Sequence, residues 1–477
     1  MTKQPEKLAH LWTTVGTRFL PFADAASDAL PLSRLLRLSL FQVSVGMALV
    51  LLTGTINRVM IVELGVSAWL VALMVALPLV FAPFRALIGH KSDMHRSVLG
   101  WRRTPYIWFG SMFQFGGLAI MPFALIILAD PSYNAVLIGQ ICAAIAFLMV
   151  GAGLHVTQTA GLALATDIAP EDARPRVVAL LYIMLLVGMG VSAVIFGLLL
   201  SDFTQVKLIK VIQGAAVVTM ALNIVALWKQ EPRNPALTAM DRDQIPFRTV
   251  WREFTRDPRA RRLLVAVGLG SAGFSMQDVL LEPYGGEILL LSVGKTTLLT
   301  AIFAGGALAG FAIAARRLTR GAEPHRLAAL GALVGIVGFS AIITAAPVES
   351  PLLFRIGVAL IGLGGGLFSV CTLTAVMELA KGADSGIALG AWGAVQATAA
   401  GVAIALGGAL RDLITALAAQ GALGPAFSTP AAGYGFVYHL EILLLFAALA
   451  AIGPLAKTVR TGDGEKQEKF GLAAFPG

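Results

Sequence analysis

The chain alternates long apolar stretches with short polar or charged segments, a pattern typical of repeated membrane crossings. A transmembrane helix rises about 1.5 Å per residue, so it needs about 20 mostly apolar residues to cross the hydrocarbon core. Twelve stretches have this length, at residues 38–61, 68–89, 105–128, 135–160, 177–200, 206–228, 263–283, 296–315, 326–346, 352–377, 386–410 and 434–456. The pattern predicts an all-α membrane protein of twelve transmembrane helices, without strands.

The longest polar segment between two predicted helices lies at the middle of the chain. Residues 229–262 are basic and contain prolines, and six predicted spans lie on each side of them. We predict that this segment is a cytoplasmic linker between an N-terminal six-helix bundle, 38–228, and a C-terminal one, 263–456. The flanking segments 1–37 and 457–477 are predicted to be a cytoplasmic N-terminal segment and a cytoplasmic tail.

The two predicted bundles share features at an offset near 220 residues. TINRVM (55–60) aligns with SMQDVL (275–280), and GAGL (151–154) aligns with GGGL (364–367). Two six-helix halves with matching features in the same order indicate parallel repeats, as in several transporter folds.

Charge fixes the predicted orientation, because Lys and Arg in short loops are retained on the cytoplasmic side. With both ends of the chain inside, only six of the 36 basic residues fall outside: Arg58, Lys207, Lys210, Lys295, Arg355 and Arg411. The net charge of +9 is therefore a topology signal, and it favours anionic lipid headgroups as partners. Nucleic acid is a poor alternative.

The loop after the second span combines a glycine, an aspartate and basic residues within 89–103, namely Gly89, Asp93, Arg96, Arg102 and Arg103. This combination resembles the signature loop of the major facilitator superfamily. Glycine allows two helices to approach, and an aspartate can accept hydrogen bonds from a helix N-terminus or pair with an arginine. The second half has Ala314 at the place of Asp93. Together with topology and duplication, this loop predicts the major facilitator fold in two six-helix parallel repeats.

Ionisable side chains at membrane depth need a partner, a water-filled cavity or a function. Arg58 in the first span and Asp278 in the seventh occupy nearly equivalent repeat positions. We hypothesise that they pair and close the outer side; the alternative is that each reaches the membrane interface separately. Glu63 and Glu282 are expected around the same outer mouth, where a solvated rim is the simpler interpretation.

Several long segments resemble one family within the superfamily. They include RLSLFQVSVGMA (37–48), NRVMIVELGV (57–66), LGWRRTPYIW (99–108) and QDVLLEPYGGEIL (277–289). These stretches are similar to the PucC and LhaA family of phototrophic bacteria, the bacteriochlorophyll delivery family, over essentially all twelve spans. The segment LPFADAASDALPL (20–32) and the overall length favour its LhaA branch.

The resemblance implies an assembly factor of the photosynthetic membrane that helps light-harvesting antenna polypeptides, of the core antenna on the LhaA branch, to acquire bacteriochlorophyll. It implies a multi-pass protein of the bacterial cytoplasmic or intracytoplasmic membrane. Bacteriochlorophyll is then a transient ligand, and antenna polypeptides and the pigment's synthesis machinery are the implied partners.

Candidate pigment contacts follow from residue type. His155 lies in the fourth span beside Gln158, and a neutral imidazole can ligate the magnesium of a chlorin ring. A hydrogen-bonded structural histidine is the alternative. Trp108 and Phe113 in the third span offer an apolar surface, and ordinary lipid-facing aromatics are the alternative there.

Catalysis is not indicated by any motif. GLGSAG (268–273) lies inside a predicted span without a preceding strand, and it is interpreted as helix-packing glycine. The two cysteines fall in apolar stretches, and we expect no metal site and no enzyme activity. An assembly chaperone and a proton-coupled transporter of a small molecule or pigment remain as competing functions. The carboxylates that the sequence offers for coupling, Asp278, Glu282 and Glu378, lie toward span ends, which favours the chaperone.

Overall fold

The computed structural model describes residues 30–80, 92, 101–130, 132–170, 174–232, 257–379, 385–427 and 429–458. The first half contains α2 (Leu32–Leu49), η2 (Val50–Ile56), η3 (Val59–Glu63), α3 (Ala68–Val80), α5 (Thr104–Leu128), α6 (Tyr133–Ile168), α7 (Arg174–Leu199) and α8 (Gln205–Leu227). The second half contains α10 (Pro258–Ser275), η4 (Met276–Val279), α11 (Leu281–Glu287), α12 (Val293–Leu318), α13 (Pro324–Ala345), α14 (Pro351–Leu379), α15 (Ser385–Ala419), η6 (Pro425–Phe427) and α16 (Ala432–Thr458).

The predicted all-α membrane fold is confirmed in the described residues. Eleven helices are long and apolar enough to cross a membrane, and each overlaps a predicted span. The second span appears as the shorter apolar helix Ala68–Leu79, because the chain beyond it lies outside the described residues. Large apolar side chains are exposed along the helices, as expected of a surface that faces lipid rather than water.

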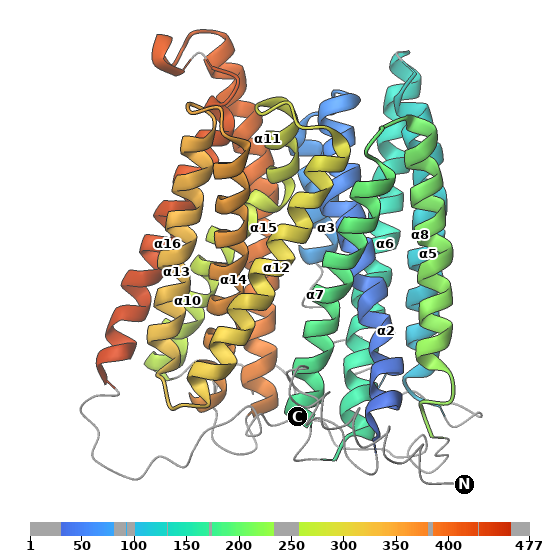
Figure 1. Ribbon diagram of the computed structural model, residues 1–477, viewed down its shortest axis with the longest axis vertical. Helices are drawn as coiled ribbons and strands as arrows, with labels where there is room; N and C mark the ends of the chain where they lie inside the picture. The colour runs from blue at the N-terminus through green and yellow to red at the C-terminus, as the bar shows by residue number, and fades with distance from the viewer. Residues whose placement is uncertain are drawn as a thin grey trace, which may run out of the picture.

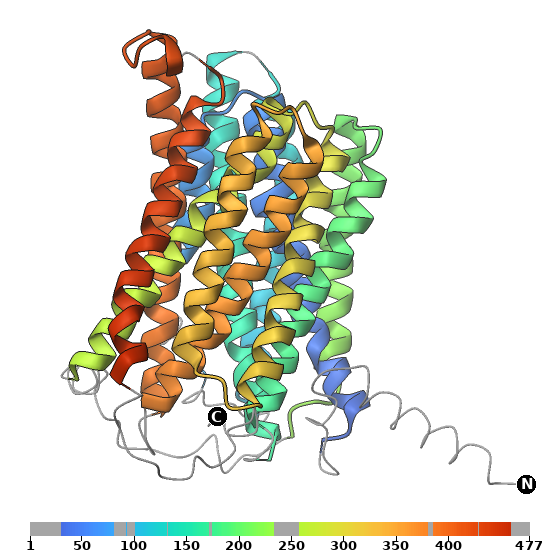
Figure 2. The same ribbon diagram turned by 60° about the vertical axis from the view of Figure 1, so that its left-hand side comes forward.

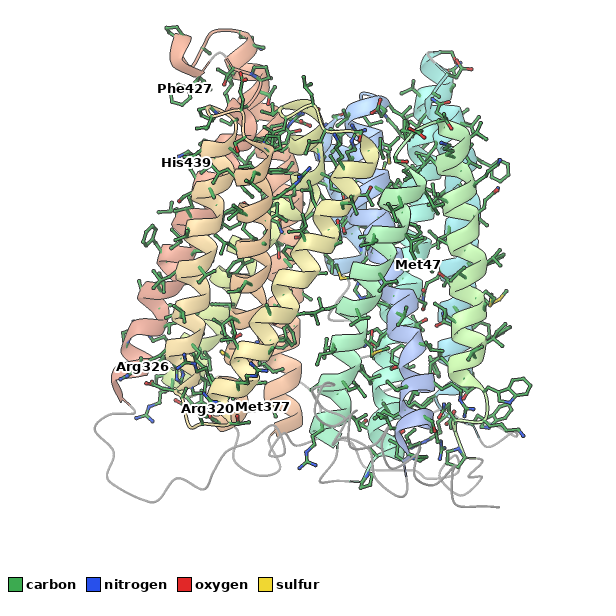
Figure 3. All side chains as sticks on the ribbon, viewed as in Figure 1. Met47, Arg320, Arg326, Met377, Phe427 and His439 are labelled. Atoms are coloured by element: carbon green, nitrogen blue, oxygen red, sulfur yellow. The ribbon has the colours of Figure 1, made fainter. Side chains whose placement is uncertain are left out.

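The helices stand roughly side by side in two groups (Figure 1). α2 begins and α16 ends at the same end of the bundle, which we call the terminal side; the opposite end is the distal side (Figures 1 and 2). Arg320 and Arg326 lie at the terminal side and Phe427 at the distal side (Figure 3). The two groups meet where α3 packs on α15 and where α7 packs on α12.

Glycines allow the helices of the second half to pack closely. A Cβ added at Gly366 of α14 would lie 2.6 Å from the carbonyl oxygen of Ala307 on α12, and one at Gly331 of α13 would lie 2.7 Å from that of Gly364. Larger side chains at these positions would push the helices apart. Close packing matters here because helices in lipid are not held together by the hydrophobic effect. The segment 268–273 is likewise helical within α10, in agreement with its interpretation as packing glycine.

Candidate functional site

The first span changes its winding before it reaches the distal side. The α-helix of α2 passes into the π-helical segments η2 and η3. π-Helical turns widen the helix and occur frequently at functional sites. The irregular segment covers the sequence TINRVM, which the repeat alignment places opposite SMQDVL in the second half.

The seventh span is interrupted at the equivalent place. α10 ends at Ser275, the short 3-10 helix η4 follows, and α11 resumes at Leu281. In a regular helix the carbonyl of Val279 would accept from the backbone nitrogen four residues later, which is Pro283 and carries no hydrogen. The break therefore leaves a carbonyl group that needs a donor from elsewhere.

The first half supplies that donor. The Nδ2 atom of Asn57, a fully buried side chain between η2 and η3, donates to the carbonyl oxygen of Val279 at 2.8 Å and to that of Thr53 at 2.9 Å. One amide group thus bridges the two irregular segments. This hydrogen bond fixes the first span against the seventh.

One further polar contact and one packing contact join the halves beside this bond. The hydroxyls of Thr55 and Thr297 lie 3.1 Å apart, and both side chains are buried. Glu282 of α11 accepts a hydrogen bond of 2.7 Å from Thr300 of α12, and its carboxyl group packs against Gly54. We call these contacts, together with the Asn57 bond, the distal seam.

Arg58 lies in the distal seam, but its predicted pairing with Asp278 is wrong. Among the described residues its guanidinium forms an ion pair with Glu63, and it also donates to the carbonyl oxygen of Leu291 at 3.3 Å. Glu63 stands five residues after Arg58, and π-helical winding brings residues at this spacing close together. Asp278 instead accepts a hydrogen bond of 2.5 Å from the side chain of Gln277.

A second connection between the halves lies at the start of α3. The backbone N–H of Trp69, in the first turn of α3, donates to the carboxylate of Asp412 on α15 at 2.8 Å. A carboxylate at this position satisfies a free N–H group and faces the positive end of the helix dipole. The neighbouring Arg411 pairs with Glu287 of α11 and contacts the Tyr434 hydroxyl at 3.1 Å. No sequence pattern indicates this cap, because it depends on the packing of α3 on α15.

Glu441 is a buried acid that is not among the residues predicted from the sequence. It lies on α16 with no exposed surface, and its Oε1 atom accepts a hydrogen bond of 2.8 Å from the backbone N–H of Gln277. The carboxyl group thereby accepts from a backbone N–H group at the break in the seventh span. Its place inside an apolar run was the only available sequence signal.

The terminal side carries a separate polar cluster within the first half. The carboxylate of Glu231 accepts hydrogen bonds of 2.6 to 3.1 Å from the backbone N–H groups of Arg102, Arg103 and Thr104, at the start of α5. The guanidinium of Arg103 pairs with Asp167 of α6 at 3.0 Å. We call this group the terminal cluster.

Only part of the predicted loop motif can be compared with the structure. Arg102 and Arg103 belong to the terminal cluster, and Arg102 also pairs with Asp167 at 3.2 Å. Gly89, Asp93 and Arg96 lie outside the described residues. In the part of the loop that is described, the acid that caps α5 is therefore Glu231, at the start of the predicted linker.

The four candidate pigment residues lie on two different surfaces. Gln114 of α5 bonds to Gly153 and Thr157 of α6, which identifies the faces that α5 and α6 share. A helix turns by about 100° per residue, so His155, two positions from both, projects from the opposite face of α6. The structure does not bring His155 together with the residues on α5.

Trp108 and Phe113 are exposed on the outside of α5, by 41% and 48%. Gln158 is half-buried, and its amide group donates to Oε1 of Gln42 on α2 at 3.5 Å. His155 is half-buried one turn away on the same helix. Among the described residues, no group of three or more His, Cys, Asp or Glu side chains could hold a metal ion.

Two repeated groups of spans, joined through irregular first and seventh helices, define a membrane protein with the major facilitator fold. The structure is similar to a bacterial homologue of the lysosomal transporter Spinster, with a TM-score of 0.65 and 15% identity over 91% of this chain and 98% of that one. This similarity shows the fold alone.

The family is shown by the sequence. The PUCC protein family model matches residues 55–459, and the chain belongs to this family. It is 60% identical to "Protein PucC" of Rhodovulum sulfidophilum over 84% of this chain and 90% of that protein. It is also 56% identical to an uncharacterized protein of the puhA-bchM intergenic region of Rhodobacter capsulatus, over 97% and 98%. These matches do not separate the LhaA branch from the PucC branch, so that preference stays a prediction.

Proposed function

We propose that this protein is an assembly factor of the photosynthetic membrane, which helps light-harvesting antenna polypeptides to acquire bacteriochlorophyll and to assemble. The observation that carries the proposal is membership of the PUCC family over residues 55–459. The partners in this proposal are antenna polypeptides of the core complex, bacteriochlorophyll and its synthesis machinery. The proposed location is the bacterial cytoplasmic or intracytoplasmic membrane, with both chain ends in the cytoplasm.

The exposed face of α5 supports an apolar partner. Trp108, Phe109, Met112 and Phe113 are each more than 40% exposed and follow one another over two turns of the helix. Aromatic and methionine side chains offer large, adaptable contact areas. An antenna helix is itself an apolar transmembrane segment, so this face is the proposed docking surface for it.

The fourth span offers a donor set that fits a chlorin ring. His155 and Gln158 stand three residues apart on α6, with Gln42 of α2 beside Gln158. A neutral imidazole nitrogen is a suitable axial ligand for magnesium, and amide groups can bond to the polar edge of the macrocycle. In the proposal, His155 ligates the pigment and the glutamine pair orients it.

A proton-coupled transporter is the second candidate function. It is favoured by the likeness of the fold to transporters and by a distal side where the two halves are interlocked. Fold alone does not define function, because one fold hosts many activities. The test uses liposomes that contain the purified protein. Proton flux that depends on added pigment or solute supports this second function, and the absence of such flux favours the assembly factor.

Deletion of the gene from a phototrophic host tests the assembly role. We expect loss of the near-infrared absorption bands of the antenna complex, with recovery when the wild-type gene is returned. The purified protein should carry bacteriochlorophyll and co-purify with antenna polypeptides. A host that keeps normal antenna absorption, together with a colourless and solitary protein, contradicts the proposal.

His155→Ala tests the pigment site, with His439→Ala as the matched control. His439 is also an intramembrane histidine, but it is exposed on α16 and its Nδ1 atom bonds to the backbone of its own helix at 2.6 Å (Figure 3). His155→Ala should lower the pigment-to-protein ratio several-fold, and His439→Ala should leave it unchanged. An equal effect of both variants assigns the loss to general damage instead.

A further inference from the structure

Two carboxyl groups meet at the break in the seventh span, inside the second half of the molecule. Gln277 of η4 contacts both of them. Its backbone N–H donates to Oε1 of Glu441 at 2.8 Å, and its side-chain amide donates to Oδ1 of Asp278 at 2.5 Å. Glu441 comes from α16, so the pair joins the seventh span to the twelfth.

Glu441 has the surroundings of a neutral acid. It is fully buried, its Oε2 atom makes no hydrogen bond with the protein, and none of the ion pairs among the described residues includes it. An ionised carboxylate removed from water needs a cation or a full set of donors, and backbone N–H groups at the start of η4 do not replace a cation. The hydroxyl of Tyr438, one turn earlier on α16, is also buried without a hydrogen bond.

The charged and titratable groups on the neighbouring elements do not supply a cation. On α15, Arg411 is engaged by Glu287, Asp412 and Tyr434. On α11, Glu282 is bonded to Thr300 and Tyr284 donates to a backbone carbonyl of α13. His439 of α16 is exposed and bonded to its own helix, and the basic end of α13 at Arg326 lies at the terminal side (Figure 3).

A second negative charge beside Glu441 makes a shared proton more favourable still. Asp278 is bonded to the same glutamine, and two carboxylates that share one site repel each other strongly. A proton on one of them removes this repulsion and leaves a single anion. The same proton gives Glu441 a hydroxyl group in place of an ion without a counter-charge.

We propose that Asp278 and Glu441 form a proton-binding site that holds one proton at neutral pH and keeps the break in the seventh span packed against α16. Loss of the proton leaves negative charges on both Asp278 and Glu441, and their repulsion separates η4 from α16. Val279, two residues further on, is bonded to Asn57 of the first half, so this movement reaches the distal seam. The proposal goes beyond the assembly role and does not depend on it.

Carbodiimide labelling of the purified full-length protein in nanodiscs tests the site. Dicyclohexylcarbodiimide reacts with protonated carboxyl groups in apolar surroundings, and peptide mass spectrometry identifies the modified residue. We expect one adduct, on Glu441 or Asp278, that disappears at alkaline pH. Glu349, an exposed acid in the loop before α14, is the internal control and should remain unmodified.

Infrared spectroscopy gives a readout that does not require reagent access. The wild type minus Glu441→Gln difference spectrum should contain the carbonyl stretch of one protonated carboxylic acid at neutral pH, whereas the wild type minus Glu349→Gln spectrum should not. Gln keeps the shape of a protonated Glu, so the variant should fold, and gel filtration checks this. A difference spectrum with only carboxylate bands overturns the proposal, as does a carbodiimide adduct on Glu349 at the same rate as on Glu441.

Discussion

The polar contacts at the two ends of the molecule differ in what they connect. At the distal side, Asn57 and Thr55 of the first half bond to Val279 and Thr297 of the second. At the terminal side, the terminal cluster joins α5 to α6 and to Glu231, which follows α8, so it contains no residue of the second half. The described contacts therefore fasten the two halves at one end only.

This difference shows what each end can do. Contacts between the halves must break if the halves are to separate at the distal side, whereas the terminal cluster can stay intact during such a movement. The distal seam holds the two halves together, whereas the terminal cluster stabilises the first half alone. Variants at the two ends should therefore change different properties.

The largest effect is expected from a wedge in the distal seam. In Gly54→Val, the added Cβ would lie 3.0 Å from the carboxyl carbon of Glu282 and 3.2 Å from Oγ1 of Thr300. Overpacking of this kind costs about 1–3 kcal/mol, which changes an equilibrium between closed and open states by about 5- to 150-fold. The closed state should lose population.

Spin labels at Ser67→Cys and Ser292→Cys, both exposed near the distal side, report the opening as a longer label–label distance. The native Cys142 and Cys371 are replaced in this experiment. Gly214→Val is the matched control, because a Cβ at this position of α8 would meet nothing within 4 Å. Unchanged label–label distances in Gly54→Val would refute the role of the distal seam in holding the halves together.

A smaller effect is expected from Asp412→Ala, which removes the acceptor for the Trp69 backbone N–H. Loss of a helix N-terminal cap costs about 0.5–2 kcal/mol. The midpoint of thermal denaturation in detergent should fall. Asp202→Ala is the control, since Asp202 is 91% exposed and lies 3.8 Å from Lys207. An equal decrease in both variants would argue against the cap.

The smallest effect is expected at the terminal side. Glu231→Gln removes a negative charge from the start of α5 and should cost about 0.3–1 kcal/mol, the usual value of such a charge at a helix N-terminus. Hydrogen exchange should accelerate in the first turn of α5, with no change in the distal label distances. Glu349→Gln serves as the control. Opening of the distal side in Glu231→Gln would contradict the separate roles assigned to the distal seam and the terminal cluster.

The twelve helices could be predicted because the hydrocarbon core imposes both a length and a composition on every crossing. Each candidate span overlaps a predicted one. The ends were less accurate. α6 continues to Ile168, beyond the predicted end at 160, and its last turn carries Asp167 to Arg103.

The candidate site was predictable as a set of residues and not as a set of contacts. Arg58, Glu63 and Glu282 gather at the distal side, as their positions near the ends of spans indicated. The partner of Arg58 depended on π-helical winding, which the apolar pattern does not reveal. Asp412 and Glu441 could not be assigned, because their partners belong to helices that are distant in sequence and adjacent only after packing.

Pro283 has a consequence for the biogenesis of the protein. It deprives Val279 of its helical donor, and the group that replaces this donor lies some 220 residues earlier, in a span that is synthesised first. Until the seventh span is inserted, the Asn57 side chain lacks the Val279 carbonyl as an acceptor. After insertion, the hydrogen bond between them satisfies a polar group on each span. Insertion of the second half is therefore needed before the first half has all of its hydrogen bonds. Separately expressed halves should associate through this pair of helices.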